Sequence, residues 1–189
     1  NMEEMLKRNY TNCINFEHTV FITEPYVDHL LSKHGFRQVA KQYFKNDHSI
    51  FYAYVKDDSV GEVNLPENLY EHNKKLYLDY INYHNQLIKD LKEKIEKVSA
   101  NQPIYLFGAH IFAQYLIAFG LNTSRIISLL DNDANKQGKR LYGTNMMVKS
   151  PKILTNVENP IIILKAGIYN NEIIEDILSN INSNTSFWS

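Results

Sequence analysis

The chain has 189 residues, of which 44% are hydrophobic and 22% charged, as is usual for a folded globular protein. Its net charge of −1 supplies no basic field, so we expect neither a nucleic-acid partner nor a membrane partner. The single cysteine, Cys13, excludes an intrachain disulfide and a zinc site built from cysteines, and it suits a reducing compartment, so we expect a cytoplasmic protein.

The first segment, residues 1–60, predicts a helix followed by a β-hairpin. Thr23 is a suitable N-cap, Pro25 stands in the first turn of the helix, and Gly35 ends it. Two extended runs, 36–44 and 49–55, flank a polar turn at 45–48. Because a hairpin with one helix buries too little apolar surface to be stable alone, we expect this segment to pack on other residues of the chain, on a second copy or on a further domain.

The second segment, residues 66–100, predicts one long amphipathic helix, or two helices with a small break. Apolar residues recur at steps of three and four, and no Gly or Pro follows Pro66 within the segment. These apolar positions are Leu69, Leu76, Tyr80, Tyr83, Leu87, Leu91, Ile95 and Val98. A helix of this length connects domains or pairs with a twin, so we expect a homodimer through it.

The third segment, residues 101–189, alternates apolar strands with helices. Strands are expected at 104–107, 125–130, 145–148 and 161–164, and helices at 111–119, 152–156 and 171–181. This alternation predicts an α/β fold, with a small Rossmann-like parallel sheet covered on both faces. Right-handed crossovers would place the carboxyl ends of its strands, and any ligand, on one edge.

The turn after the first of these strands is the first candidate binding site. Gly108 and Ala109 have small side chains, so a phosphate could approach the backbone and the helix N-terminus there. His110 begins the helix, where it could donate a hydrogen bond to an anion or serve equally well as the polar cap of an ordinary turn. The incomplete glycine pattern disfavours a dinucleotide oxidoreductase.

The second candidate is Asp131 with the loop 131–144 that it begins. Asp131 ends the second strand and follows Gly108 by roughly 20 residues, the spacing at which a Rossmann carboxylate binds ribose hydroxyls. Aspartate also occurs at such positions for local reasons, because it favours turns. The loop offers Asn132, Lys136, Gly138 and Thr144, and its backbone N–H groups and lysine could bind a diphosphate. Taken alone, the loop is better explained as a solvated connection.

The third candidate is the pair Glu17 and His18, a carboxylate beside an imidazole just before the first helix. Such a pair can perform general acid–base chemistry, and a solvent-exposed loop pair explains it equally well. The remaining histidines show no spacing of metal ligands, so we expect no metal site.

Several of these residues resemble a known family. Residues 106–109, the loop 131–139 with Gly143-Thr144, and Ser150-Pro151 resemble the C-terminal domain of the sugar C-methyltransferases, enzymes that methylate a carbon of a nucleotide-linked keto-sugar. Residues 136–138, Lys-Gln-Gly, are the most specific part of this likeness. Residues 17–21 are similar to the family segment that carries the catalytic histidine, and the helix and hairpin after them resemble the end of a class I methyltransferase fold.

The resemblance implies a role for each candidate residue. His18, with Glu17 beside it, would be the general base that removes the proton alpha to the ketone of the sugar. The nucleotide-linked sugar would be bound by Gly108, Ala109, His110, Asp131, Asn132, Lys136, Gly138 and Thr144. The likeness covers only the second half of the family architecture, without the core that binds S-adenosylmethionine. We therefore expect this chain alone to bind no cofactor and to be inactive, unless a methyl-donor domain is supplied by another chain or by further residues.

An alternative from another class is a non-catalytic Rossmann-like interaction module. In that case the long helix drives dimerisation and the α/β domain is a scaffold, because a fold does not determine a function.

Overall fold

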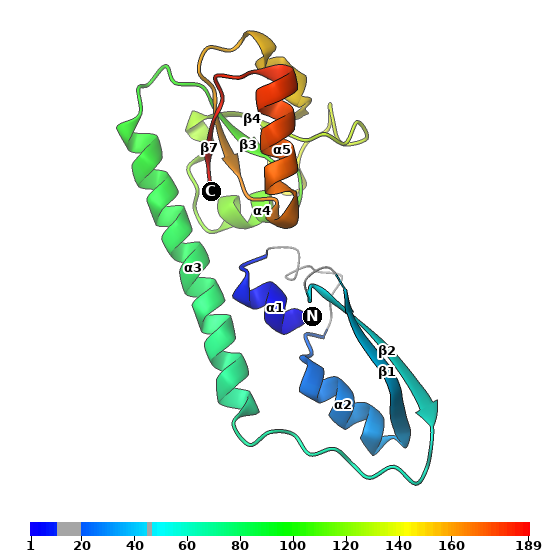
Figure 1. Ribbon diagram of the computed structural model, residues 1–189. Helices are drawn as coiled ribbons and strands as arrows, with labels where there is room; N and C mark the ends of the chain where they lie inside the picture. The colour runs from blue at the N-terminus through cyan, green and yellow to red at the C-terminus, as the bar shows by residue number, and fades with distance from the viewer. Residues whose placement is uncertain (11–19, 45–46) are drawn as a thin grey trace. The chain divides into compact units, whose positions relative to one another are not determined.

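The computed structural model describes residues 1–10, 20–44 and 47–189, which form two compact units, Asn1–Tyr83 and His84–Ser189 (Figure 1). The boundary between the units falls inside the long helix α3 (Leu69–Lys97), so that this helix contributes residues to both. The sequence segmentation treated the same helix as a separate connecting element.

The first unit contains the predicted helix and hairpin. After a short helix α1 (Met2–Lys7), α2 (Glu24–Lys33) begins at Thr23 and ends before Gly35, whose φ of +72° suits glycine. Strands β1 (Phe36–Phe44) and β2 (Ser49–Lys56) then pair antiparallel, as the two extended runs around a polar turn predicted. Residues 45 and 46 of the predicted turn lie outside the described part of the chain.

The contact between α2 and the hairpin is largely polar. The Tyr54 hydroxyl donates to an Asp28 carboxylate oxygen at 2.8 Å, and Lys41 forms ion pairs with both Glu24 and Asp28. The Tyr43 hydroxyl donates to the same Glu24 carboxylate at 2.8 Å. Glu24 and Asp28, one turn apart on α2, thus bind residues of both strands, which fixes the helix on that face of the hairpin.

Helix α3 is a single continuous helix, which decides between the two predicted forms. Seven of the eight predicted apolar positions are buried or partly buried, and only Tyr83 departs, with 40% of its surface exposed. In the first unit, Tyr80 packs with Leu6 of α1 in a small core. In the second unit, the following turns of α3 pack against the sheet.

The second unit is an α/β domain with five parallel strands, as predicted. The strands are β3 (Ile104–Phe107), β4 (Ile126–Leu130), β5 (Val148–Lys149), β6 (Ile161–Leu164) and β7 (Ser186–Trp188), in the order β5-β4-β3-β6-β7. Strand β5 is shorter than the predicted 145–148, and β7 was not predicted. The connecting helices are α4 (Ile111–Ala118), α5 (Asn170–Asp176), the 3₁₀ turns η2 (Thr123–Arg125), η3 (Pro151–Asn156) and η4 (Gly167–Tyr169), and a π-helical turn η5 (Ile177–Ile181).

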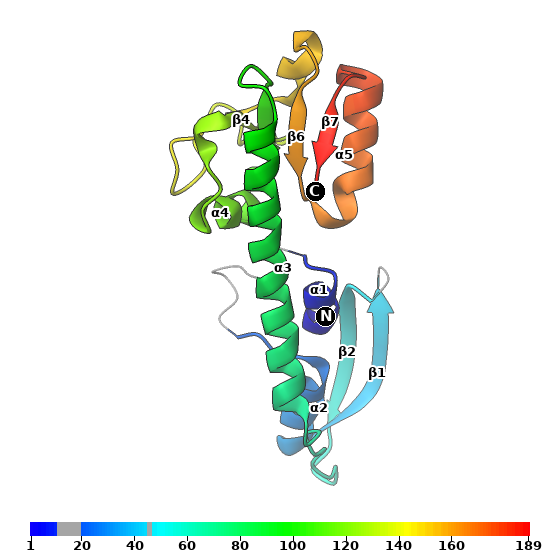
Figure 2. The same ribbon diagram turned by 90° about the vertical axis from the view of Figure 1, so that its left-hand side faces the viewer.

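Helices cover both faces of this sheet (Figure 2). On one face, α3 and α4 pack against the strands in a core that includes Leu91, Leu106, Phe112, Leu116, Leu129 and Ile163. On the other face, η3, α5 and η5 pack in a second core that includes Phe107, Leu130, Leu154, Ile162, Ile173 and Ile177. Burial on both faces explains why β3 and β6 are continuously apolar in sequence.

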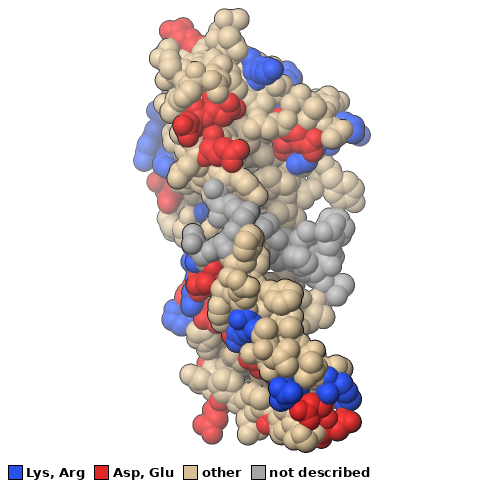
Figure 3. Space-filling model, turned by 45° about the vertical axis from the view of Figure 1, so that its right-hand side comes forward, with Lys and Arg blue, Asp and Glu red and all other residues tan. Residues whose placement is uncertain are grey.

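Two further properties concern membranes and charge. No helix in the described part of the chain combines the length and apolarity that crossing a bilayer requires. On the face drawn in Figure 3, basic and acidic side chains are interspersed, in keeping with the net charge of −1.

Candidate functional site

The strand order of the second unit indicates where a ligand would bind. The chain leaves β3 toward β4 and β5, then returns to place β6 on the other side of β3. Open α/β sheets bind ligands outside the carboxyl ends of the strands, at such a point of reversal. The segments that follow these ends are the Gly108 turn after β3, Asp131 after β4, and residues 165–167 after β6.

The Gly108 turn is tightly held by its own backbone. Gly108 has a φ of +98°, a conformation that favours glycine, and its N–H donates to the carbonyl of Leu130 at 2.7 Å. The N–H of Ala109 donates to Asp131 Oδ2 at 2.8 Å. The two small residues predicted to leave backbone N–H groups for a phosphate therefore donate both of them within the protein.

His110 caps helix α4. It lies at the N-cap with extended backbone angles, and the N–H of Phe112 donates to its Nδ1 at 3.2 Å. Burial lowers the pKa of His110, and the nearby Lys136 lowers it further, against an opposite effect of Asp131. The imidazole is consequently neutral at pH 7, with its proton on Nε2 because Nδ1 accepts. Of the two predicted roles, capping is the one that this geometry displays.

Asp131 joins the turn to the loop that follows β4. Its Oδ2 accepts from the N–H of Ala109 and from Lys136 Nζ at 3.1 Å, and its Oδ1 accepts from the N–H of Asp133 at 2.9 Å. Burial by itself raises the pKa of this carboxyl, but the bonds from the two N–H groups and from Lys136 outweigh it, and the pKa lies below its usual value. A carboxylate can accept about four hydrogen bonds, so one position on Oδ1 is left for a ligand hydroxyl among the described contacts.

The loop after Asp131 is a folded structure and not a loose connection. It doubles back as an antiparallel ribbon, with a bridge between Arg140 and Met147, and Gly138 at a φ of +77° donates its N–H to the carbonyl of Val148. Thr144 closes the tip by donating its hydroxyl to the carbonyl of Leu141 at 3.0 Å. Gly138 and Thr144 thus shape the loop, whereas Asn132 is exposed near its start.

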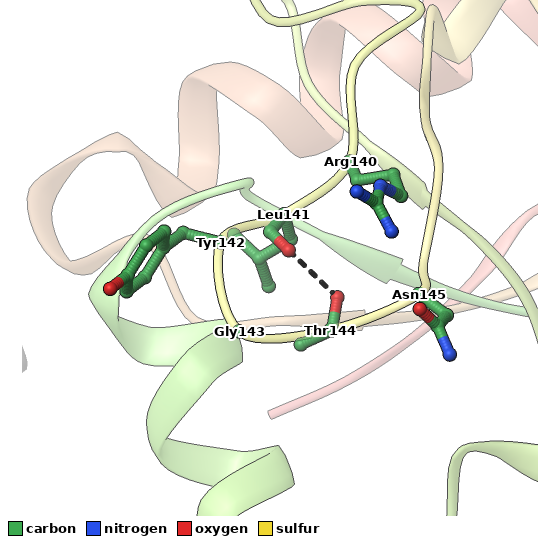
Figure 4. Close-up of a pocket in the computed structure, with 6 residues that line it drawn as sticks. All are labelled: Arg140, Leu141, Tyr142, Gly143, Thr144 and Asn145. Carbon is green, nitrogen blue, oxygen red and sulfur yellow. Dashed lines mark hydrogen bonds between the residues drawn. The ribbon is translucent and has the colours of Figure 1, made fainter.

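A pocket of about 630 Å³ lies at the tip of this ribbon (Figure 4). It is lined by Arg140, Leu141, Tyr142, Gly143, Thr144 and Asn145. Tyr142 points away from Arg140 and Asn145, and 88% of its surface is exposed. Gln114 of α4 donates to the carbonyl of Tyr142 at 3.2 Å, so the tip is fastened to the helix that His110 caps.

The tip has the groups that anion binding requires. Gly143 adopts a φ of +76°, and the N–H groups of Tyr142, Gly143 and Asn145 have no acceptor within the described part of the molecule. Over the same residues, no carboxylate forms an ion pair with Arg140. Unpaired backbone N–H groups and a guanidinium that line the same pocket are suited to bind phosphate oxygens.

Sequence reasoning missed part of this site. It selected Gly138, Thr144 and Lys136, but not Arg140, Tyr142 and Asn145, which line the pocket. The signal that could have found them is the pair of glycines at 138 and 143, since two glycines within a short loop indicate a reversal with its tip between or beside them. The segment 165–167, which follows β6 at the point of reversal, was also not selected, although Gly167 begins the 3₁₀ turn η4 soon after the strand.

The predicted catalytic pair, His18 and Glu17, lies outside the described residues, and its role stays a prediction. For S-adenosylmethionine, the residues described in the first unit do not fit: they form an antiparallel hairpin with helices, and not the parallel strand–turn–helix unit of a nucleotide-type cofactor site. Within the described ranges, no cluster of three or more His, Cys, Asp or Glu side chains is arranged to hold a metal ion.

Comparison with known proteins adds no further assignment: no protein-family model and no curated protein sequence matches this chain. The likeness to sugar C-methyltransferases therefore rests on the motifs in the sequence alone.

Proposed function

We propose that the second unit, His84–Ser189, binds a nucleotide-linked sugar and serves sugar C-methylation. The observation that carries this proposal is the pocket at Arg140–Asn145, which the loop beginning at Asp131 forms beside α4. Its volume of about 630 Å³ lies within the usual range for small-molecule sites. The class of ligand comes from the resemblance of the loop 131–144 to the family that methylates nucleotide-linked sugars.

Different residues of the second unit would bind the different parts of the ligand. Arg140 and the N–H groups of Tyr142 and Gly143 would bind the diphosphate, because these donors have no partner in the described part of the chain. Asp131, with one acceptor position left on Oδ1, would accept a ribose hydroxyl. Lys136 is bound to Asp131 and would have a smaller role in binding than its sequence motif predicts.

Titration calorimetry with dTDP-glucose and UDP-glucose tests this proposal. We expect saturable binding to the wild-type chain, and an affinity at least tenfold lower for Arg140→Ala, because a lost charge-assisted hydrogen bond of about 1.5–3 kcal/mol corresponds to that factor or more. The matched control is Lys97→Ala, which removes an exposed cation at the end of α3. Lys97 precedes the start of β3 by a few residues, so it lies near the amino ends of the strands, whereas the loop with the pocket follows their carboxyl ends. Absence of binding by the wild type, or equal losses in both variants, would contradict the proposal.

The single cysteine supports a cytoplasmic location as part of the same proposal, since a reducing compartment leaves it as a thiol. Any methyl transfer would further require a methyl-donor domain, on another chain or in further residues.

One observation favours an interaction module as the second candidate. Leu78 and Ile81 lie almost one turn apart on α3, with 50% and 38% of their surfaces exposed. A second copy of the chain that covers them would give the predicted homodimer. Light scattering should then report a dimer that Leu78→Glu converts to a monomer. Gln86→Glu adds an equal charge to an exposed position of the same helix, about 80° from Leu78 and about 140° from Ile81 around its axis, and should leave the dimer intact. A monomeric wild type would exclude this arrangement.

A further inference from the structure

The Gly108 turn occupies the position at which dinucleotide-binding folds hold a pyrophosphate. In those folds the phosphates contact the backbone of small residues and the N-terminus of the following helix. Glycine at position 108 should leave the required space open, because it has no side chain.

In this protein that space is already filled by the imidazole of His110. A Cβ atom built on Gly108 would lie 2.5 Å from His110 Nε2 and 2.8 Å from its Cδ2, closer than van der Waals contact allows. The ring therefore occupies the space that the missing side chain of Gly108 would otherwise leave open. The backbone conformation, with its φ of +98°, and the histidine of the same turn both require glycine here, so a ligand is not needed to explain it.

The ring is fixed in this position. Its Nδ1 accepts a hydrogen bond from the N–H of Phe112, which has no acceptor within α4 itself. Because the imidazole is neutral, it also lacks the attraction that an imidazolium would have for an anion. To move aside, the ring would have to release this hydrogen bond, at a cost of about 1 kcal/mol.

Two further features oppose a phosphate at the turn. The N–H of Gly108 donates to Leu130, and the N–H of Ala109 donates to Asp131. A pyrophosphate would meet an aromatic ring and two committed donors. Backbone donors without an acceptor in residues 1–10, 20–44 and 47–189 are found instead at the tip of the loop, in the pocket at Arg140–Asn145.

We propose that His110 is a specificity-determining residue, which closes the Gly108 turn to the pyrophosphate of dinucleotides and restricts this unit to nucleoside-diphosphate ligands bound on the loop. The ligand that is accepted rests on the proposed function. The ligand class that is rejected rests on the geometry of the turn alone.

The test compares NADH with dTDP-glucose, by calorimetry on the full chain. His110→Asn is the informative variant, because asparagine is a good N-cap that retains an acceptor for Phe112 but removes the ring. We expect the wild type to bind NADH at least tenfold more weakly than dTDP-glucose, and His110→Asn to gain at least tenfold in affinity for NADH. The matched control, His72→Asn, changes an exposed histidine of α3 in the first unit and should leave both affinities unchanged.

A second variant separates filling the space from capping the helix. His110→Phe retains a ring over Gly108 but has no acceptor for Phe112, so it should still reject NADH. The inference is overturned if the wild type binds NADH as tightly as dTDP-glucose, or if a folded His110→Asn gains no affinity for NADH. If the wild type binds neither ligand but His110→Asn gains NADH, the proposed function fails and the role of His110 stands.

Discussion

Replacement of Asp131 by asparagine should destabilise the second unit while preserving the shape of the side chain. One carboxylate oxygen becomes an NH₂ group, which then faces either the N–H of Asp133 or the pair formed by the Ala109 N–H and Lys136. The NH₂ group of asparagine thus faces another hydrogen-bond donor and loses the bond on that side. The hydrogen bonds to the remaining oxygen persist, but they are weaker because this oxygen carries no formal charge.

The structure gives the expected size of this effect. A hydrogen bond to a charged group contributes about 1.5–3 kcal/mol. The ion pair with Lys136 adds no more than about 1 kcal/mol, because 41% of the lysine side chain is exposed and solvent screens the interaction. Since asparagine retains an acceptor on one side, we expect Asp131→Asn to lower the free energy of unfolding by about 2–3 kcal/mol.

Urea unfolding followed by tryptophan fluorescence measures this change in the second unit alone. Trp188 is the only tryptophan of the chain, and it lies in β7, packed against the core formed with α3 and α4. Asp133→Asn is the matched control: it makes the same chemical change two residues away, at an exposed side chain, and should shift the free energy by less than about 0.5 kcal/mol. Equal stabilities of the two variants would refute the role assigned to the Asp131 carboxylate.

The same carboxylate gives a pH dependence with a definite sign. The folded-state pKa of Asp131 is lowered, so its contribution to stability is complete above the unfolded-state pKa of about 4 and is lost as the pH falls through the folded-state value. Wild-type stability should decline in this acid range, and Asp131→Asn should decline less. Parallel pH profiles of the two proteins would contradict this linkage.

Three more changes test the packing of the units. Gly108→Ala should cost more than about 1 kcal/mol, because the φ of +98° and the ring of His110 both oppose a Cβ, whereas Gly61→Ala, in open space, should cost little. Leu91→Ala should cost about 2–5 kcal/mol by leaving a cavity in the core beside α4, as reported by Trp188 fluorescence. Tyr54→Phe removes the hydroxyl that donates to Asp28 and should cost about 1 kcal/mol in the first unit, measured by thermal unfolding in circular dichroism; no change there would show that this polar contact contributes nothing.

Most of the secondary structure was predictable, because it is encoded in local patterns. The continuous apolar runs at 104–107 and 161–164 indicate strands buried on both faces, and the structure places them side by side at the centre of the sheet. Strand β7 escaped prediction because Ser186–Trp188 is short and follows a polar stretch. It is a strand only because β6 offers it an edge with which to pair.

The positions of Gly108 and Asp131 in the fold were predictable, but their contacts and the pocket at residues 140–145 were not. The sequence predicted that Gly108 and Asp131, each directly after an apolar strand, lie at the same edge of the sheet. The structure confirms this, because β3 and β4 are parallel neighbours. The sequence did not indicate that the Asp131 carboxylate accepts the N–H of Ala109, since that bond joins residues 22 positions apart. The same holds for Arg140, whose place in a pocket depends on how the loop folds back on itself.

The sequence by itself therefore determined the α/β class, the hairpin with its preceding helix, and the edge of the sheet at which Gly108 and Asp131 lie. These properties follow from the period and length of apolar runs, which act over a few residues. Only the tertiary structure decided that the imidazole of His110 covers Gly108, and that the N–H groups of Tyr142, Gly143 and Asn145 have no acceptor among the described residues. Such decisions depend on which groups meet across the fold, and each N–H or carboxylate that finds a partner inside the protein is no longer available to a ligand.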